Sequence, residues 1–292
     1  IFLEAGMPPE AISLVHGGPA VGEQMITHPM VAGISFTGST KVGKAIHATA
    51  SQLMKKTQLE MGGKNPQIVL RDADIGLAVD HCTAAALDVT GQRCTCTSRV
   101  LVEKEVAEEF TDRFVDRFKK VRVGPGHRAD VDMGPLVDMT RLKDVEAFVE
   151  RAKKEGAKVL TGGERPQGLN DGAFYKPTVM NNIKRDYEIA GEEVFGPVVG
   201  VLEVGNLDEA MSIANDVDYG LAASIFTRDL KRAFSFIDKI EAGMIHINRP
   251  TLGGFSHFPF GGLKNSSFGP REIGDDTVSF YTSMKSVYIN HA

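Results

Sequence analysis

The sequence predicts an α/β protein whose sheets are mostly parallel. Short runs rich in valine and isoleucine alternate with helical patterns along the chain, and the connections between them are short. The 31 glycines gather at the turns between these runs. With 292 residues, 42% of them hydrophobic, the chain is long enough to bury a substantial core in one or two domains.

Each strand is predicted from a short apolar run that ends at glycine or at another turn residue. In chain order, we expect strands at 12–18, 31–39, 65–70, 99–104, 198–204, 222–227 and 243–248. A last strand is expected at 280–290, where it would pair within the chain or across a subunit boundary.

Each helix is predicted from apolar residues at helical spacing. The clearest stripe runs through 105–121 and contains Val106, Phe110, Phe114 and Phe118. The segment 140–156 ends at a glycine, the residue favoured after a helix C-terminus. The other helices are expected at 40–50, 75–89, 206–216 and 228–240.

Composition and charge exclude several partners. A net charge of −5 gives no basic surface, so nucleic acid is not an expected partner. The apolar stretches are too short to cross a bilayer, so no membrane partner is expected. Three cysteines and no signal-peptide pattern indicate a reducing, cytoplasmic setting. The chain starts at Ile1 in what resembles a helix end, so we expect a fragment that lacks its N-terminal part.

The stretch from Gly38 to Lys44 nearly matches the phosphate-binding loop of nucleotide phosphotransferases. The next residue is Ala45, so the hydroxyl that binds Mg²⁺ in that loop is missing, which counts against ATP binding. A turn between a strand and a helix still offers N–H groups to the phosphate of a dinucleotide. An ordinary strand–helix turn explains the pattern equally well.

Two carboxylate-bearing turns are candidate sites. Glu60 precedes the pair Gly62-Gly63, and a turn of this kind can expose a general base in a cleft. Glu192 and Glu193 precede Phe195 in a second turn. Taken alone, each is better explained as a solvated loop. The glycine-rich stretch 258–274 contains three phenylalanines and suits a loop that lines a cleft or a packed aromatic loop.

The stretch "TGQRCTCTSR" holds Cys94 and Cys96. No second cysteine pair or histidine pair accompanies them, so no metal site is expected, and a disulfide between them would be strained. A buried structural pair is one interpretation. The polar neighbours favour another, in which a thiol beside Arg93 has a lowered pKa and acts as a nucleophile.

The order of these motifs carries a resemblance that no single motif does. "SFTGSTKVGK", "LEMGGKNP", "GQRCTCTSR", "EEVFGP" and "PFGG" with its following lysine occur in the order and spacing of the aldehyde dehydrogenase superfamily. The segment "YGLAASIFTRDL" is also similar to that family. The resemblance extends over the whole chain, and Glu60 lies 34 positions before Cys94, as the family's general base and nucleophile do.

The resemblance implies a role for each motif. Cys94 would attack the aldehyde carbonyl to give a thiohemiacetal, hydride transfer to a nicotinamide would leave a thioester, and Glu60 would activate water to hydrolyse it. The backbone N–H of Cys94 would supply half of an oxyanion hole. The implied cofactor is NAD or NADP. The residues expected to bind it are Thr37, Gly38, Ser39 and Gly43 around the phosphates, Glu193 at the nicotinamide ribose and Phe195 near the ring.

The resemblance also implies a domain plan and an assembly. Residues 1–62 would be the C-terminal part of a Rossmann-type dinucleotide-binding domain, 63–265 an α/β catalytic domain, and 266–292 a tail with an oligomerisation strand. The intact protein would be a homodimer or homotetramer. The family's oxyanion-hole Asn and its cofactor Lys lie upstream of the phosphate turn and have no counterpart here. We therefore expect the chain alone to be inactive or nearly so.

The substrate is expected to be an aldehyde, and the tail indicates a semialdehyde. Its segments "NRPTLGGFSHFPFGG", "GPREIG" and "FYTSMKSVYI" look most like the 2,5-dioxovalerate (α-ketoglutarate semialdehyde) branch. Glu60 favours hydrolysis to the free acid, since the CoA-acylating branch typically lacks this residue. Arg93 could attract a carboxylate-bearing substrate. Succinate semialdehyde and general aliphatic aldehydes remain open, as does a non-catalytic member with a structural or regulatory role.

Overall fold

The computed structural model describes residues 1–291 and has a seven-stranded sheet at its centre. Every neighbouring pair in this sheet is parallel except β5 with β6, which confirms the mostly parallel α/β fold. The strands stand in the order β10 (Met244–Ile247), β9 (Ala222–Phe226), β3 (Asn65–Val69), β4 (Thr97–Glu103), β7 (Val198–Val204), β6 (Thr178–Asn181) and β5 (Lys158–Thr161).

Helices cover both faces of this sheet and make a three-layer body. One face packs against α3 (Ile75–Leu87) and α4 (Lys104–Lys119), and the other against α7 (Leu207–Asn215) and α8 (Leu230–Lys239). The predicted stripe on α4 is buried, with Phe110, Phe114 and Phe118 at 0 to 1% exposure. Beyond β7, α5 (Met139–Glu155) packs with the short α6 (Glu188–Gly191) over β6, and its end cap is Gly156 in the left-handed conformation.

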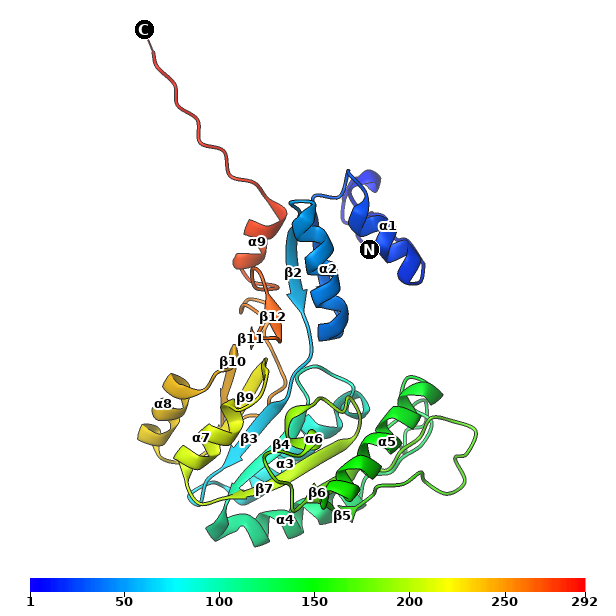
Figure 1. The fold of residues 1–292 in the computed structure, drawn as a ribbon, viewed down its shortest axis with the longest axis vertical. Coiled ribbons are helices and arrows are strands. Elements are labelled where there is room, and N and C mark those ends of the chain that lie inside the picture. Colours follow the sequence, from blue (N-terminus) through cyan, green and yellow to red (C-terminus); the bar gives the residue numbers. More distant parts are fainter. Residues whose placement is uncertain (292) are drawn as a thin grey trace.

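A second, smaller sheet stands at one end of this body (Figure 1). It consists of β1 (Gly33–Thr37), β2 (Lys56–Glu60) and β12 (Ser267–Phe268), with β1 parallel and β12 antiparallel to β2. The helices beside it are α1 (Pro19–Thr27) and α2 (Thr40–Gln52). The other short elements are β8 (Tyr219–Gly220), which pairs with β11 (Leu263–Lys264), α9 (Asp276–Tyr281), and the 3₁₀ turns Pro9–Ala11 and Asp88–Gly91.

One predicted strand is wrong, and a second has no partner within this chain, so its pairing across a subunit boundary stays a prediction. The segment 12–18 forms no strand among the described residues, and its apolar side chains are exposed, including Leu14 at 82%. A β-rich run becomes a strand only where another strand accepts its ladder of hydrogen bonds. The segment 280–290 begins at the end of α9 and then extends away from the body without a strand partner in this chain (Figure 1).

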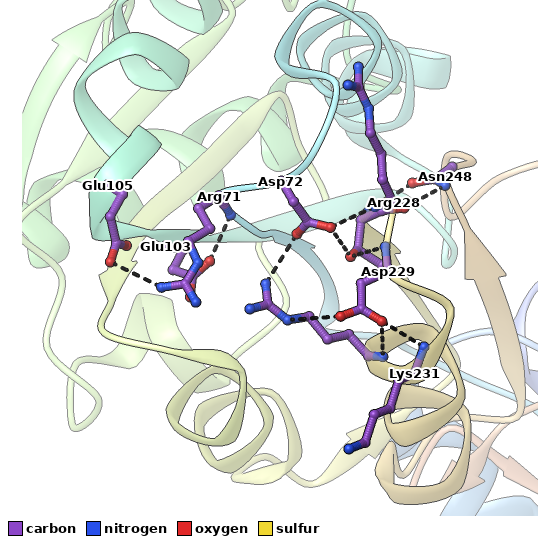
Figure 2. Close-up of polar contacts among 10 residues, drawn as sticks. Arg71, Asp72, Glu103, Glu105, Arg228, Asp229, Lys231 and Asn248 are labelled. Atoms are coloured by element: carbon purple, nitrogen blue, oxygen red, sulfur yellow. Dashed lines mark hydrogen bonds and ion pairs between the residues drawn. The ribbon is translucent and has the colours of Figure 1, made fainter.

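The carboxyl ends of the large sheet are closed by a polar network (Figure 2). Asp72, just after β3, accepts hydrogen bonds from the Thr227 hydroxyl at 2.7 Å and the Arg228 amide at 2.8 Å, and pairs with Arg232. The Asn248 side chain after β10 exchanges two hydrogen bonds with the backbone of Thr227. In open parallel sheets this end commonly holds the ligand. Here its polar groups bond to one another, and the candidate residues lie at the opposite end.

Candidate active site

The predicted residues meet where the carboxyl ends of β1 and β2 face the amino ends of β3, β4 and β7. In the small sheet, Thr37 pairs with Glu60, which places the glycine turn after β1 directly beside the candidate base. The Gly38 N–H donates to the Glu60 carbonyl at 3.0 Å. The strand containing Glu60 was not predicted, because "KTQLE" has a polar pattern although four of its five residues are buried.

The Glu60 carboxyl group is buried at 2% exposure, and burial is the main reason that its pKa rises to about 7. The Ser267 hydroxyl donates to Glu60 Oε2 at 2.5 Å and lowers this pKa, while Glu272 raises it and Arg271 lowers it. A carboxyl with a pKa near neutrality can accept and return a proton at physiological pH, which suits a general base.

Two glycines after Glu60 let the Glu193 turn and the cysteine turn approach. A Cβ atom at Gly62 would lie 2.7 Å from Glu193 Oε2, and one at Gly63 would lie 2.5 Å from the Cys94 carbonyl oxygen. The Gly63 N–H donates to Glu193 Oε1 at 3.0 Å. A side chain at Gly63 would collide with backbone, whereas one at Gly62 would displace the Glu193 carboxylate.

The cysteine turn precedes β4 and has an unusual backbone. Val89 and Thr90 both have positive φ, 47° and 61°, and Gly91 follows with φ 69°. Asn65 holds the far side of the turn: its Nδ2 donates to the carbonyl oxygens of Cys94 at 2.7 Å and Cys96 at 2.8 Å. The two cysteines are therefore fixed by a side chain from the neighbouring strand β3 rather than by each other.

The expected lowering of the Cys94 pKa is wrong. The pKa of the thiol is raised to about 11, first by burial and then by the nearby carboxylates of Glu193 and Glu60. Arg93 acts in the opposite direction but more weakly. Its guanidinium pairs with Asp88 at 2.7 Å, so much of its charge is already compensated. The resting thiol is protonated, and two candidate carboxylates lie close enough to influence it.

The two cysteines of the turn differ in environment. Cys94 is partly exposed, whereas Cys96 is 7% exposed and its Sγ lies 3.3 Å from the Asp88 carbonyl oxygen, to which it donates. Burial raises the pKa of Cys96 to about 12. Cys82 belongs to α3 and is buried in the core. Of the three thiols, Cys94 is the one that can meet a substrate.

The remaining predicted residues lie around this centre. Ser39 caps α2, its Oγ accepting from the Val42 N–H at 3.4 Å, and the turn from Thr37 to Ser39 is exposed. Gly43 is buried, and a Cβ atom there would lie 2.4 Å from the Met61 sulfur. Phe195 is half-buried with φ 52°, in the same turn as Glu193.

Sequence reasoning missed three polar residues that hold the site. Arg99, 1% exposed, donates to the carbonyl oxygens of Lys64, Ile213 and Ala214, and so ties the turn before β3 to the end of α7. Thr251 donates to the Thr95 carbonyl oxygen at 2.7 Å. The third, Ser267, donates its hydroxyl proton to Glu60 Oε2 at 2.5 Å. Local residue patterns do not predict these contacts, since they join segments far apart in the chain.

Two further properties concern residues 1–291, namely membrane-spanning helices and metal-binding clusters. No helix in this range is both long and apolar enough to cross a membrane. No cluster of three or more histidine, cysteine, aspartate or glutamate side chains in the same range is arranged to hold a metal ion. The chemistry that the site can perform is that of a thiol, a carboxyl group with a pKa near neutrality, a second, half-buried carboxylate and an exposed glycine turn.

Known proteins are similar to this chain over nearly its whole length. The chain is 42% identical over 291 residues to an α-ketoglutaric semialdehyde dehydrogenase of Bacillus subtilis, and 41% over 292 residues to a 2,5-dioxopentanoate dehydrogenase of Saccharolobus solfataricus. Each match covers 99% of this chain and 60% of the relative, so the chain spans about 60% of the length of these curated relatives.

Solved structures give the same result. A betaine aldehyde dehydrogenase from Staphylococcus aureus in complex with NAD⁺ matches with a TM-score of 0.92 and 38% identity, over 96% of this chain and 55% of that one. An NAD-dependent aldehyde dehydrogenase from Sinorhizobium meliloti matches with a TM-score of 0.94 and 34% identity, over 98% and 57%. The family model described as "Aldehyde dehydrogenase family" matches residues 1–287, and the chain belongs to that family.

Proposed function

We propose that this protein oxidises an aldehyde to the carboxylic acid with NAD or NADP, using Cys94 as nucleophile and Glu60 as general base. The observation that supports this most directly is the meeting of Glu60, Cys94 and Glu193 at one end of the sheet, with both carboxylates raising the pKa of the thiol. The Gly38 turn reaches the same place through its hydrogen bond to Glu60. Family membership adds weight to the assignment.

In the proposed reaction, Cys94 Sγ bonds to the aldehyde carbon and its proton passes to the carbonyl oxygen, which gives a thiohemiacetal. A bound dinucleotide would accept the hydride of this carbon, and loss of the hydroxyl proton to solvent would leave a thioester on Cys94. Glu60 then takes a proton from water as the water oxygen adds to the acyl carbon. The carbon–sulfur bond breaks toward sulfur, the acid leaves, and the thiol is restored.

The residues of this chain fit a dinucleotide. The exposed turn from Thr37 to Ser39 leads into the 13-residue helix α2, whose first N–H groups can receive a phosphate. Glu193 is fixed by the Gly63 N–H beside Cys94 and leaves its second oxygen for a ribose hydroxyl, and Phe195 is in the same turn. Whether NAD or NADP binds is decided by residues outside this set.

The proposed substrate is a semialdehyde, which the names of the two curated relatives support. Arg93 is a weaker candidate for the substrate carboxylate than the sequence indicates, because Asp88 already pairs with it. We propose a homodimer or homotetramer for the assembly. The exposed residues after α9 support this, with Met284 at 97% and Tyr288 at 94% exposure. We also propose domain boundaries after residues 62 and 265. The proposed location is the cytoplasm.

We further propose that the 292 residues alone turn over aldehyde poorly, because they match about 60% of the length of their relatives. Turnover by this chain equal to that of a form covering the relatives' full length would contradict this. The alternative is a family member with a structural or regulatory role. Ordered retention of Glu60, Cys94 and Glu193 favours the enzyme.

The test uses a form that covers the relatives' full length and follows its formation of NADH and NADPH across a panel of semialdehydes. Cys94→Ser should abolish reduced-cofactor formation, because no thiohemiacetal can form. Glu60→Gln should keep a first burst and block later turnover, because the thioester persists. Cys96→Ser is the matched control and should keep both phases. If Cys96→Ser lost the burst and Cys94→Ser kept it, the nucleophile would be Cys96 and not Cys94.

A further inference from the structure

Ser267 stands opposite Glu60 in the small sheet, where the short strand β12 pairs antiparallel with β2. Its hydroxyl lies 2.5 Å from Glu60 Oε2. The Gly262 N–H donates to the same Ser267 oxygen at 2.6 Å. Because the amide of Gly262 uses a lone pair of the hydroxyl, the hydroxyl proton is directed at the carboxylate. The serine thus acts as a fixed donor to an acidic group that is 2% exposed.

Neighbouring residues hold the Ser267–Glu60 contact in place. Gly261 has φ 149°, and a Cβ there would lie 2.8 Å from Glu60 Oε1 and 2.6 Å from an Arg271 guanidinium nitrogen. Arg271 donates to the Gly262 carbonyl oxygen, which anchors the loop that also presents its N–H to Ser267. The charged or titratable groups that influence Glu60 are Arg271 and Glu272, and Glu60 in turn influences Cys94.

We propose that Ser267 is a positioning residue for Glu60, and that its hydroxyl holds the carboxylate in the place and charge state needed to activate water. This rests on the proposed function, because it concerns the hydrolysis of an acyl group on Cys94. In that step the water oxygen bonds to the acyl carbon and Glu60 takes one water proton. The carbon–sulfur bond then breaks with its electrons on Cys94 Sγ, which regains the proton.

The consequence of losing the hydroxyl has a definite sign. Burial and Glu272 raise the pKa of Glu60, and Ser267 lowers it. Without the hydroxyl, the opposing raising effects remain, so the pKa moves above its present value of about 7. A hydrogen bond to a charged group corresponds to a shift of about one pH unit. Less of the base is ionised at neutral pH, and hydrolysis slows there but recovers at alkaline pH.

The experiment needs no cofactor. The 292-residue chain is mixed with p-nitrophenyl acetate, and nitrophenol release is followed from pH 6 to pH 10. The burst reports acetyl transfer to Cys94, and the steady rate reports hydrolysis of the acetyl thioester. We expect Ser267→Ala to keep the burst amplitude, lower the steady rate at pH 7 about fivefold, and raise the midpoint of its pH profile by about one unit.

Ser266→Ala is the matched control, because the Ser266 hydroxyl accepts from the Gly220 N–H at 2.9 Å instead of contacting Glu60. Its midpoint should equal that of the parent. Ser267→Thr keeps the hydroxyl and should restore the parent profile. If Ser267→Ala does not fold, Ser267→Cys has nearly the same shape with a weaker donor, and its midpoint should still rise.

The outcomes separate the two proposals. Absence of a Cys94-dependent burst both in the 292-residue parent and in a form that covers the relatives' full length overturns the proposed function. A parent burst together with an unchanged midpoint in folded Ser267→Ala or Ser267→Cys overturns the role of Ser267 and leaves the proposed function standing. An equal shift in Ser266→Ala would show a general loosening of the loop, and would also overturn the role of Ser267.

Discussion

Gly91 passes so close to Gly196 that a Cβ atom on Gly91 would lie 2.2 Å from the Gly196 carbonyl oxygen. Gly91 opens the cysteine turn, and Gly196 closes the turn that contains Glu193. This contact joins the two turns backbone to backbone, without an intervening side chain. The distance between the thiol and the second carboxylate therefore depends on a glycine with φ 69°.

Gly91→Ala should be among the most damaging single substitutions in the chain. The new methyl group collides with the Gly196 backbone, and φ 69° is unfavourable for alanine. We expect a loss of more than about 3 kcal/mol in the free energy of unfolding, measured by urea denaturation. Gly126→Ala is the control, because nothing lies within 4 Å of its added Cβ. Equal stability of the two variants would contradict the close approach.

Asn65→Ala should loosen the cysteine turn and cost about 2 kcal/mol of stability, because two buried carbonyl oxygens lose their donor. The rate at which iodoacetamide alkylates Cys94 should change severalfold. Asn215→Ala is the control. The Asn215 side chain donates to one backbone carbonyl oxygen and accepts from one backbone amide, away from the cysteines. This variant should lose stability and leave the Cys94 rate as in the parent. Unchanged alkylation in Asn65→Ala would show that the turn holds itself.

Glu193→Gln should make Cys94 more reactive. Burial first and the Glu193 carboxylate second raise the pKa of the thiol to about 11, so removing the Glu193 charge lowers that pKa and increases the thiolate fraction at pH 8. We expect alkylation by iodoacetamide to be about three to ten times faster. Glu192→Gln removes an equal charge one residue away, outside the groups that act on Cys94, and should have little effect. A rate for Glu193→Gln no higher than the parent's would be inconsistent with this arrangement.

Lys64→Met should stabilise the protein, and more at pH 6 than at pH 9. Lys64 is 2% exposed, its ammonium has no hydrogen-bond partner among the described residues, and burial lowers its pKa to about 7. A lowered lysine pKa destabilises the fold fully below pH 7, and this effect diminishes as pH rises toward the unfolded value. The difference in stability gain between the two pH values should be roughly 2 kcal/mol.

Thermal melting of parent and variant at both pH values measures this. A gain that is the same at pH 6 and pH 9 would mean that the lysine is neutral or solvated throughout. Lys158→Met, at an exposed position in the edge strand β5, is the control and should show no pH-dependent gain.

Much of the fold could be predicted because local patterns and final burial agree. The apolar runs that became β3, β4, β7 and β9 are buried on both faces of a parallel sheet, and the phenylalanine stripe of α4 fits one face of it. The errors in strand prediction occur where the presence of a neighbouring strand decides whether a segment becomes a strand. Residues 12–18 have strand composition but no ladder partner among the described residues, while β2 has polar composition and gains two neighbours.

The sequence by itself determined the ordered motifs, the residue types of the candidate site and the alternation that specifies a parallel sheet, since these depend on residues close together in the chain. Only the tertiary structure decided the contacts among them. Cys94 meets carboxylates that raise its pKa, Asp88 compensates Arg93, and Ser267 reaches Glu60 across 207 positions. Burial and charge proximity set these properties, and both arise only when distant segments pack together.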